Sequence, residues 1–77
     1  MRVQVKLYGS LRDHLPAETK GKTVVDLTPD ATVASLLAKL GIEHDVLTAI
    51  NQEHKLNNLA VLKEGDYVTV FEMTAGG

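Results

Sequence analysis

Hydrophobic and polar residues alternate strictly over residues 2–8, where Val3, Val5 and Leu7 fall on one face. A period of two is typical of a β-strand buried on one side. A second strand is predicted over residues 23–27, because three of these five residues are β-branched. The chain therefore begins with two strands.

An amphipathic helix is predicted after the second strand. Apolar residues recur there with the helical spacing i, i+3, i+4 and i+7, at Val33, Leu36, Leu37 and Leu40. Thr32 is placed to cap the first turn, and Gly41 stands where a left-handed residue ends such a helix. We expect the helix to lie between these two residues.

The second half of the chain predicts further strands. A strand is predicted over residues 46–50, Val-Leu-Thr-Ala-Ile, and Asn51-Gln52 is a turn. The alternation is lost through residues 56–58. The last strand, residues 67–71, places Val68 and Val70 on one face. Its other face carries Tyr67, Thr69 and Phe71.

The loop between the first two strands has signals of its own. Ser10 is predicted to cap a short helical turn over residues 11–15, with Asp13 as the reciprocal residue of a capping box. Leu11 and Leu15 lie one turn apart and are expected to hold this turn to the core. Pro16 ends it, and residues 17–21 read as a polar loop.

This order of elements predicts an α+β fold, the β-grasp of ubiquitin. The first and last strands are expected to form a parallel central pair in a mixed sheet, with the helix packed on one face. We expect one domain over residues 1–77, with residues 72–77 as a flexible projecting tail.

Charge and composition exclude several classes of function. The chain has 8 basic and 10 acidic residues, a formal net charge of −2, whereas nucleic-acid binding favours a basic face. It has no cysteine, which excludes thiolate chemistry and disulfides. The longest apolar run has four residues, 59–62, so we expect no membrane association and a cytoplasmic location.

Catalytic constellations are not apparent in the sequence. The histidines at 14, 44 and 54 lack metal-ligand spacing, and we expect no metal and no bound cofactor. Asp26 and Asp30 flank a turn without an adjacent base, so they are better explained as turn and cap formers. We therefore expect a protein that is not itself an enzyme.

The pair Gly76-Gly77 is the sequence's clearest functional signal. A carboxylate becomes a good electrophile once ATP has adenylated it, and it must enter a narrow channel to reach the α-phosphate. Residues without a Cβ atom make the thinnest and most adaptable peptide for such a channel. Gly77 is therefore the candidate reactive residue, and Thr74, Ala75 and Gly76 are the residues that thread into a partner's active site.

Five segments in order resemble the ubiquitin-like sulfur carriers, which include the molybdopterin synthase small subunit and the thiamine-pathway carrier. These segments are Leu7-Tyr8-Gly9-Ser10-Leu11-Arg12, residues 32–41, Ala49-Ile50-Asn51-Gln52, residues 62–68 and Gly76-Gly77. The resemblance implies that an E1-like adenylyltransferase uses ATP to activate Gly77. It further implies a Gly77 thiocarboxylate that donates sulfur in cofactor biosynthesis.

Two segments, residues 7–12 and the tail, indicate which members of the family the chain resembles most. Residues 7–12 resemble the molybdopterin synthase small subunit, although Glu72 and Met73 stand where that subunit often has a proline pair. The ending at residues 74–77 is closer to the thiamine carrier. We expect a role in molybdopterin synthesis with the synthase large subunit as partner. The alternatives are a thiamine carrier that acts with thiazole synthase, a covalent protein modifier, and a non-covalent β-grasp module.

A docking surface is expected beside the tail. If the helix covers the valine face of the last strand, Phe71 lies on the open face, where Tyr8 and Met73 extend the apolar surface. In the family that the chain resembles, partners dock on this face. The alternative places Phe71 under residues 52–62. Alone, the chain is expected to be monomeric.

Overall fold

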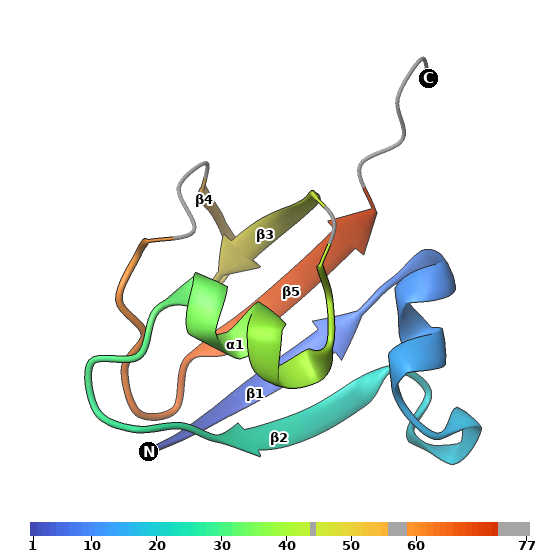
Figure 1. The fold of residues 1–77 in the computed structure, drawn as a ribbon, viewed down its shortest axis with the longest axis horizontal. Helices are drawn as coiled ribbons and strands as arrows, with labels where there is room; N and C mark the ends of the chain where they lie inside the picture. Colours follow the sequence, from blue (N-terminus) through green and yellow to red (C-terminus); the bar gives the residue numbers. More distant parts are fainter. Residues whose placement is uncertain (44, 56–58, 73–77) are drawn as a thin grey trace.

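A five-stranded mixed sheet carries one α-helix across one of its faces (Figure 1). The structure is a computed structural model that describes residues 1–43, 45–55 and 59–72. Its elements are β1 (Arg2–Leu7), the 3₁₀ helices η1 (Gly9–His14) and η2 (Ala17–Thr19), β2 (Lys22–Asp26), α1 (Val33–Leu40), β3 (Val46–Ile50), β4 (Glu53–Lys55) and β5 (Tyr67–Glu72).

The strand order β2-β1-β5-β3-β4 places β1 and β5 side by side. These two strands run parallel, with Val5 opposite Val68 and Leu7 opposite Val70, whereas all other pairs are antiparallel. The predicted parallel central pair and the β-grasp fold are therefore confirmed.

The core lies between α1 and the sheet (Figure 1). Val3, Val5, Leu7, Val68 and Val70 are at most 2% exposed on this face of β1 and β5. Burying an aliphatic side chain of this kind stabilises the fold by about 1.5–3 kcal/mol. From the other side, this layer is closed by the residues of the predicted helical stripe, Val33, Leu36 and Leu37, with Leu40 partly buried.

Both ends of α1 agree with the sequence prediction. The Thr32 Oγ1 accepts a hydrogen bond from the Ser35 N–H at 3.2 Å. Gly41 has φ of 80°, and its N–H donates to the Ala38 carbonyl at 3.1 Å. A left-handed residue ends the helix because it turns the chain back onto the last carbonyls, and glycine adopts this conformation without strain.

The capping box predicted at Ser10 is wrong. η1 begins at Gly9, two residues before the predicted start at Leu11, and follows Tyr8 in an extended conformation without a side-chain cap. Ser10 therefore lies inside the 3₁₀ helix instead of at its start. The anchoring role expected of Leu11 is correct, since this side chain is only 1% exposed.

Three strands also differ from the prediction. β2 covers Lys22–Asp26, one residue earlier than the expected residues 23–27. β4 was not predicted, and its backbone pairs antiparallel with β3 directly after the turn at residues 51–52, with Ile50 opposite Glu53. Its three residues, Glu-His-Lys, are all polar, so they carry no hydrophobic alternation. β5 continues through Glu72, which we expected to begin the tail. Residues 73–77 lie outside the described residues.

Candidate functional site

The face of the sheet opposite α1 carries two of the residues predicted to contact a partner, Tyr8 and Phe71. Residues directly opposite each other in paired strands point to the same face. Phe71 of β5 lies opposite Leu47 of β3, and Thr69 lies opposite Ala49. The valines of β5 occupy the helix side, so Phe71 lies on the open face and not in the core.

Two aromatic rings stack at the end of β5. The Tyr8 and Phe71 ring centroids are 4.9 Å apart and the ring planes differ by 5°. Tyr8 is 39% exposed, and Leu47, directly opposite Phe71, is 40% exposed. We refer to Tyr8, Leu47 and Phe71 as the aromatic cluster. Large apolar side chains grouped in this way on a surface are typical of a protein interface.

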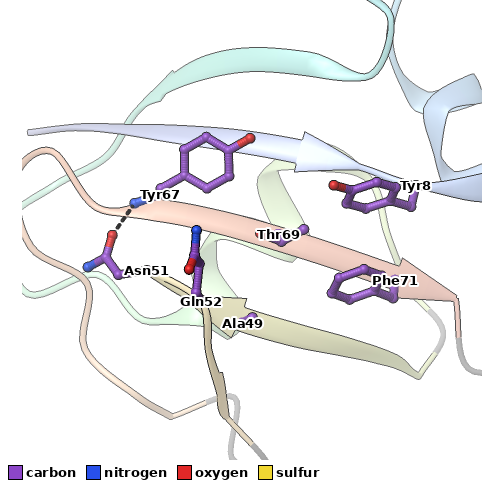
Figure 2. A pocket seen from close by; sticks show the side chains of 7 residues that line it. All are labelled: Tyr8, Ala49, Asn51, Gln52, Tyr67, Thr69 and Phe71. Carbon is purple, nitrogen blue, oxygen red and sulfur yellow. Dashed lines mark hydrogen bonds between the residues drawn. The ribbon is translucent and has the colours of Figure 1, made fainter.

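A hollow of about 670 Å³ extends from the aromatic cluster along the open face. Figure 2 shows Tyr8 and Phe71 near one end, Tyr67 toward the other, and the small side chains of Ala49 and Thr69 between them. These two small residues form the floor of the hollow, and the taller aromatic rings rise beside them. A partner side chain has room above this floor.

The far end of the hollow is fixed by a polar network around Asn51. The Asn51 Oδ1 accepts from the Tyr67 N–H at 3.0 Å (Figure 2), and the Asn51 Nδ2 donates to Asp66 Oδ1 at 3.0 Å. The other oxygen of this carboxylate accepts from the Lys63 N–H at 2.8 Å. These bonds tie the β3–β4 turn to the start of β5 and hold the rim of the hollow in place.

Cations lie along the open face of β1 and β2, although the whole chain has a net charge of −2. Lys6 and Lys22 are directly opposite each other. The Lys6 Nζ lies 5.0 Å from the centroid of the Tyr8 ring, a cation–π distance. The open face therefore combines apolar rings with positive charge, which suits a partner surface that is apolar with acidic groups at its border.

The structure brings together two of the predicted partner-binding residues, Tyr8 and Phe71. Met73 and the tail residues Thr74, Ala75, Gly76 and Gly77 lie outside the described residues. Phe71 is one residue from the end of β5 at Glu72, so the chain passes the aromatic cluster immediately before residue 73. Sequence analysis missed Leu47, which the antiparallel register of β3 with β5 would have identified.

Other kinds of site find no support in the part of the chain that the structure describes. No group of three or more His, Asp or Glu side chains is arranged there to hold a metal ion. Within the same residues, no helix has the length and apolar character needed to cross a membrane.

Solved structures with the same fold cover nearly all of the chain. SAMP1 from Haloferax volcanii matches with a TM-score of 0.75 and 20% identity over 100% of both chains. A Pyrococcus furiosus protein assigned as molybdopterin converting factor, subunit 1, matches with a TM-score of 0.76 and 22% identity over 96% of this chain and 99% of that chain. At these identities the similarity establishes the fold.

A third similar structure is the complex of subunits 1 and 2 of the molybdopterin-converting factor from Helicobacter pylori. It matches with a TM-score of 0.66 and 19% identity over 100% of both chains. No curated protein sequence matches significantly. The model of the ThiS family, in contrast, matches residues 5–77. This match covers almost the whole chain, and the protein therefore belongs to the ThiS family of ubiquitin-like β-grasp proteins.

Proposed function

We propose that this protein is a sulfur carrier whose Gly77 carboxylate is adenylated by an E1-like enzyme and converted to a thiocarboxylate. The observation that carries the proposal is the ThiS family match, which runs from residue 5 through Gly76 and Gly77. The carrier supplies the reactive carboxylate and the surface that presents it. ATP and the catalytic groups belong to the partner, so the carrier binds no cofactor and is not an enzyme.

Two successive substitutions give the product, the first at the α-phosphorus of ATP and the second at the Gly77 carbonyl carbon. A Gly77 carboxylate oxygen attacks the α-phosphorus of ATP, and pyrophosphate leaves. A sulfur nucleophile at the oxidation level of sulfide then attacks the Gly77 carbonyl carbon, and AMP leaves. Glycine suits both steps because an absent Cβ lets the peptide adopt whatever φ the partner's channel requires. Thr74, Ala75 and Gly76 are the residues that occupy this channel.

The aromatic cluster is proposed as the anchor that brings the tail to the channel. Phe71 and Tyr8 present adjacent faces and edges to solvent, and the hollow beside them accepts a partner side chain. Met73 continues the apolar surface in sequence. A partner that binds the cluster lies next to the point where the tail begins. Binding there keeps Gly77 close to the partner's active site.

The sulfur acceptor is proposed to be a molybdopterin precursor, with this chain as the small subunit of the synthase. Support comes from the fold that it shares with a molybdopterin converting factor subunit 1 and with the Helicobacter pylori complex of subunits 1 and 2. The second partner is then the synthase large subunit. Since activation consumes ATP, the proposal places the protein in the cytoplasm.

Two alternatives use the same activated carboxylate. A thiamine carrier would transfer its sulfur through thiazole synthase. A protein modifier would transfer Gly77 to a lysine amine, and the fold shared with the small archaeal modifier protein SAMP1 supports this alternative. The intact mass of the protein from its own host separates a sulfur carrier of either pathway from a protein modifier. One oxygen replaced by sulfur indicates a carrier, and an isopeptide-linked partner indicates a modifier.

The decisive experiment measures ATP–pyrophosphate exchange by the E1-like enzyme with wild-type protein and with Gly77→Ala. We expect exchange to be abolished in Gly77→Ala while the melting temperature is unchanged, because a terminal residue contributes almost nothing to the core. Val61→Ala, an exposed change outside the site, is the matched control. An exchange rate in Gly77→Ala equal to that of the control would contradict the proposal.

A further inference from the structure

The outer edge of β2 is a border of the sheet without a neighbouring strand in the described part of the chain (Figure 1). Hydrogen bonds beside β2 show which of its backbone groups face this edge. The Leu7 N–H donates to the Gly21 carbonyl at 2.7 Å, and the Leu27 N–H donates to the Met1 carbonyl at 2.7 Å. Such hydrogen-bonded pairs alternate along an antiparallel ladder.

This alternation divides the residues of β2 into two sets. Thr23 and Val25 direct their backbone groups toward β1, as Gly21 and Leu27 do on either side. Lys22, Val24 and Asp26 therefore direct their N–H and C=O groups away from the sheet. The side chains of these three residues share the open face, and Val24 is 56% exposed.

We propose that two copies of this chain associate by antiparallel pairing of their β2 edges, around a two-fold axis at Val24. Val24 of each copy then exchanges both of its outward hydrogen bonds with Val24 of the other. In this register Lys22 of one copy lies opposite Asp26 of the second copy, and the second copy's Lys22 lies opposite Asp26 of the first. The edge is thus complementary to itself in charge and in hydrogen bonding.

The charge pairs favour this register over its neighbours, and they favour a second copy of this chain as the partner of the edge. Sliding the second copy by two residues in either direction places Val24 opposite Lys22 or Asp26 and removes the matched Lys22–Asp26 pairs. Oppositely charged residues directly across an antiparallel ladder stabilise it, and like charges destabilise it. Because the same patch serves on both copies, the pairing closes on itself as a dimer and does not continue into a filament.

The contacts already made at the edge are compatible with this pairing. The Asp26 carbonyl accepts from Lys39 Nζ at 2.6 Å, which leaves its second lone pair for a backbone N–H of the other copy, and Val24 is 56% exposed. The Arg2–Asp26 ion pair, at 3.1 Å, joins two side chains that are each 73% exposed. A carboxylate in such a position accepts a further cation, and Lys22 of the second copy supplies it.

The dimer leaves the candidate functional site free. A two-fold axis perpendicular to the sheet puts both helices on one side and both open faces on the other. β1 separates β2 from β5 and its Phe71, so the aromatic cluster lies away from the seam between the copies. Two short strands bury far less than the roughly 1,600 Å² of a standard stable interface. The association is therefore expected to be weak, with the chain monomeric when dilute.

Sedimentation equilibrium over a dilution series from millimolar concentration tests this pairing with reciprocal charge variants. Lys22→Asp and Asp26→Lys each convert both charge pairs from attractive to repulsive, and we expect self-association to weaken about tenfold or more. An equimolar mixture of the two variants places opposite charges across the edge again, so association returns as a heterodimer. Lys63→Asp, which makes the same charge change away from β2, retains wild-type association.

Val24→Pro provides an independent test through the backbone. Proline removes an N–H that faces solvent, so the β1–β2 ladder is retained while the edge loses its central donor. We expect this variant to be monomeric, with circular dichroism confirming that it and the charge variants are folded. A wild-type protein that stays monomeric at millimolar concentration overturns the proposal. Wild-type association by folded Lys22→Asp or Asp26→Lys, or a mixture that fails to associate, also overturns it.

Discussion

The two faces of the sheet are built from alternate residues of the same strands, yet they differ sharply in burial. On the helix side, Val3, Val68 and Val70 are fully buried beneath α1. On the open side, Tyr8 is 39% and Leu47 is 40% exposed, beside the half-buried Phe71. One face therefore holds the fold together, whereas the other presents large apolar side chains to solvent.

This difference is informative because the protein is small. A chain of 77 residues buries a smaller fraction of its surface than a larger domain, so each apolar side chain left uncovered forgoes stability that the fold needs. Charged residues occupy the open face of β1 and β2, as is usual, but an aromatic stack lies beside them at the end of β5. We therefore expect the helix side to carry stability and propose that the open side carries recognition, and substitutions on each side test that division.

The largest expected effect is on the helix side. Leu36 is 0% exposed, and Leu36→Ala should lower the free energy of unfolding by about 2–5 kcal/mol through lost burial and the cavity that remains. Denaturant unfolding measures this loss. Leu36→Met, which conserves volume, should cost less than about 1.5 kcal/mol. An unfolding curve for Leu36→Ala that coincides with wild type would show that the helix stripe does not carry the core.

The matching change on the open side is Phe71→Ala. We expect partner affinity to fall by about 2 kcal/mol, roughly thirtyfold, because a central aromatic anchor is lost. The loss of thermal stability should be much smaller than for Leu36→Ala, since Phe71 is only half-buried. Calorimetric titration with the E1-like enzyme, beside a melting curve, measures both effects.

Val61→Ala is the control for that experiment, because Val61 is 54% exposed but lies outside the hollow. It should leave both affinity and melting temperature close to wild type. A Phe71→Ala protein that melts far below wild type yet binds the enzyme normally would reverse the roles assigned to the two faces.

The helix side was largely predictable from the sequence. Its signals are local: a complete apolar stripe at helical spacing, a threonine before it and a glycine after it. The strict alternation of β1 and the valines of β5 identified the two central strands, and the connection between them is long enough for the crossover that a parallel pair needs. Each of these features depends on residues close together in the chain or on a single strong pattern.

The open side was predicted less completely because its geometry depends on pairing between distant residues. The position of Phe71 followed from alternation alone, but the contribution of Leu47 requires the register of β3 with β5. β4 has only polar residues, so its pairing is a backbone property without a hydrophobic signal. Ser10 carried a capping signal, but η1 begins two residues before the predicted start, at Gly9 with φ of 64°.

A moderate effect is expected at the start of the helix. Thr32→Ala removes the acceptor of the Ser35 N–H and should lower the free energy of unfolding by about 1 kcal/mol. Thr32→Ser keeps a hydroxyl and should recover most of the loss. Denaturant unfolding of both variants measures the effect, and enzyme affinity should not change. Equal stability of Thr32→Ala and wild type would show that this cap does not stabilise α1.

The smallest expected effect is a gain in stability at the rim of the hollow. Asn51 and Gln52 have φ of 51° and 72°, and together they form the two-residue turn between β3 and β4. A turn with two positive φ values favours Asn-Gly, so Gln52 is the residue that fits it poorly. A left-handed conformation costs a non-glycine residue about 1–2 kcal/mol, whereas glycine's greater freedom in the unfolded chain offsets about 0.5–1 kcal/mol.

The strain relieved at Gln52 exceeds the entropy cost of glycine, so Gln52→Gly should raise the free energy of unfolding by about 0.5 kcal/mol. Replicate denaturant unfolding can resolve this gain. Asn51→Gly is the contrasting variant, because it also removes the side-chain bonds to Asp66 and Tyr67 and should destabilise the protein. Enzyme affinity should be unchanged in Gln52→Gly if the aromatic cluster is the anchor. An affinity loss in this stabilised variant would extend the recognition surface along the hollow to the turn, and a loss of stability would contradict the strain assigned to Gln52.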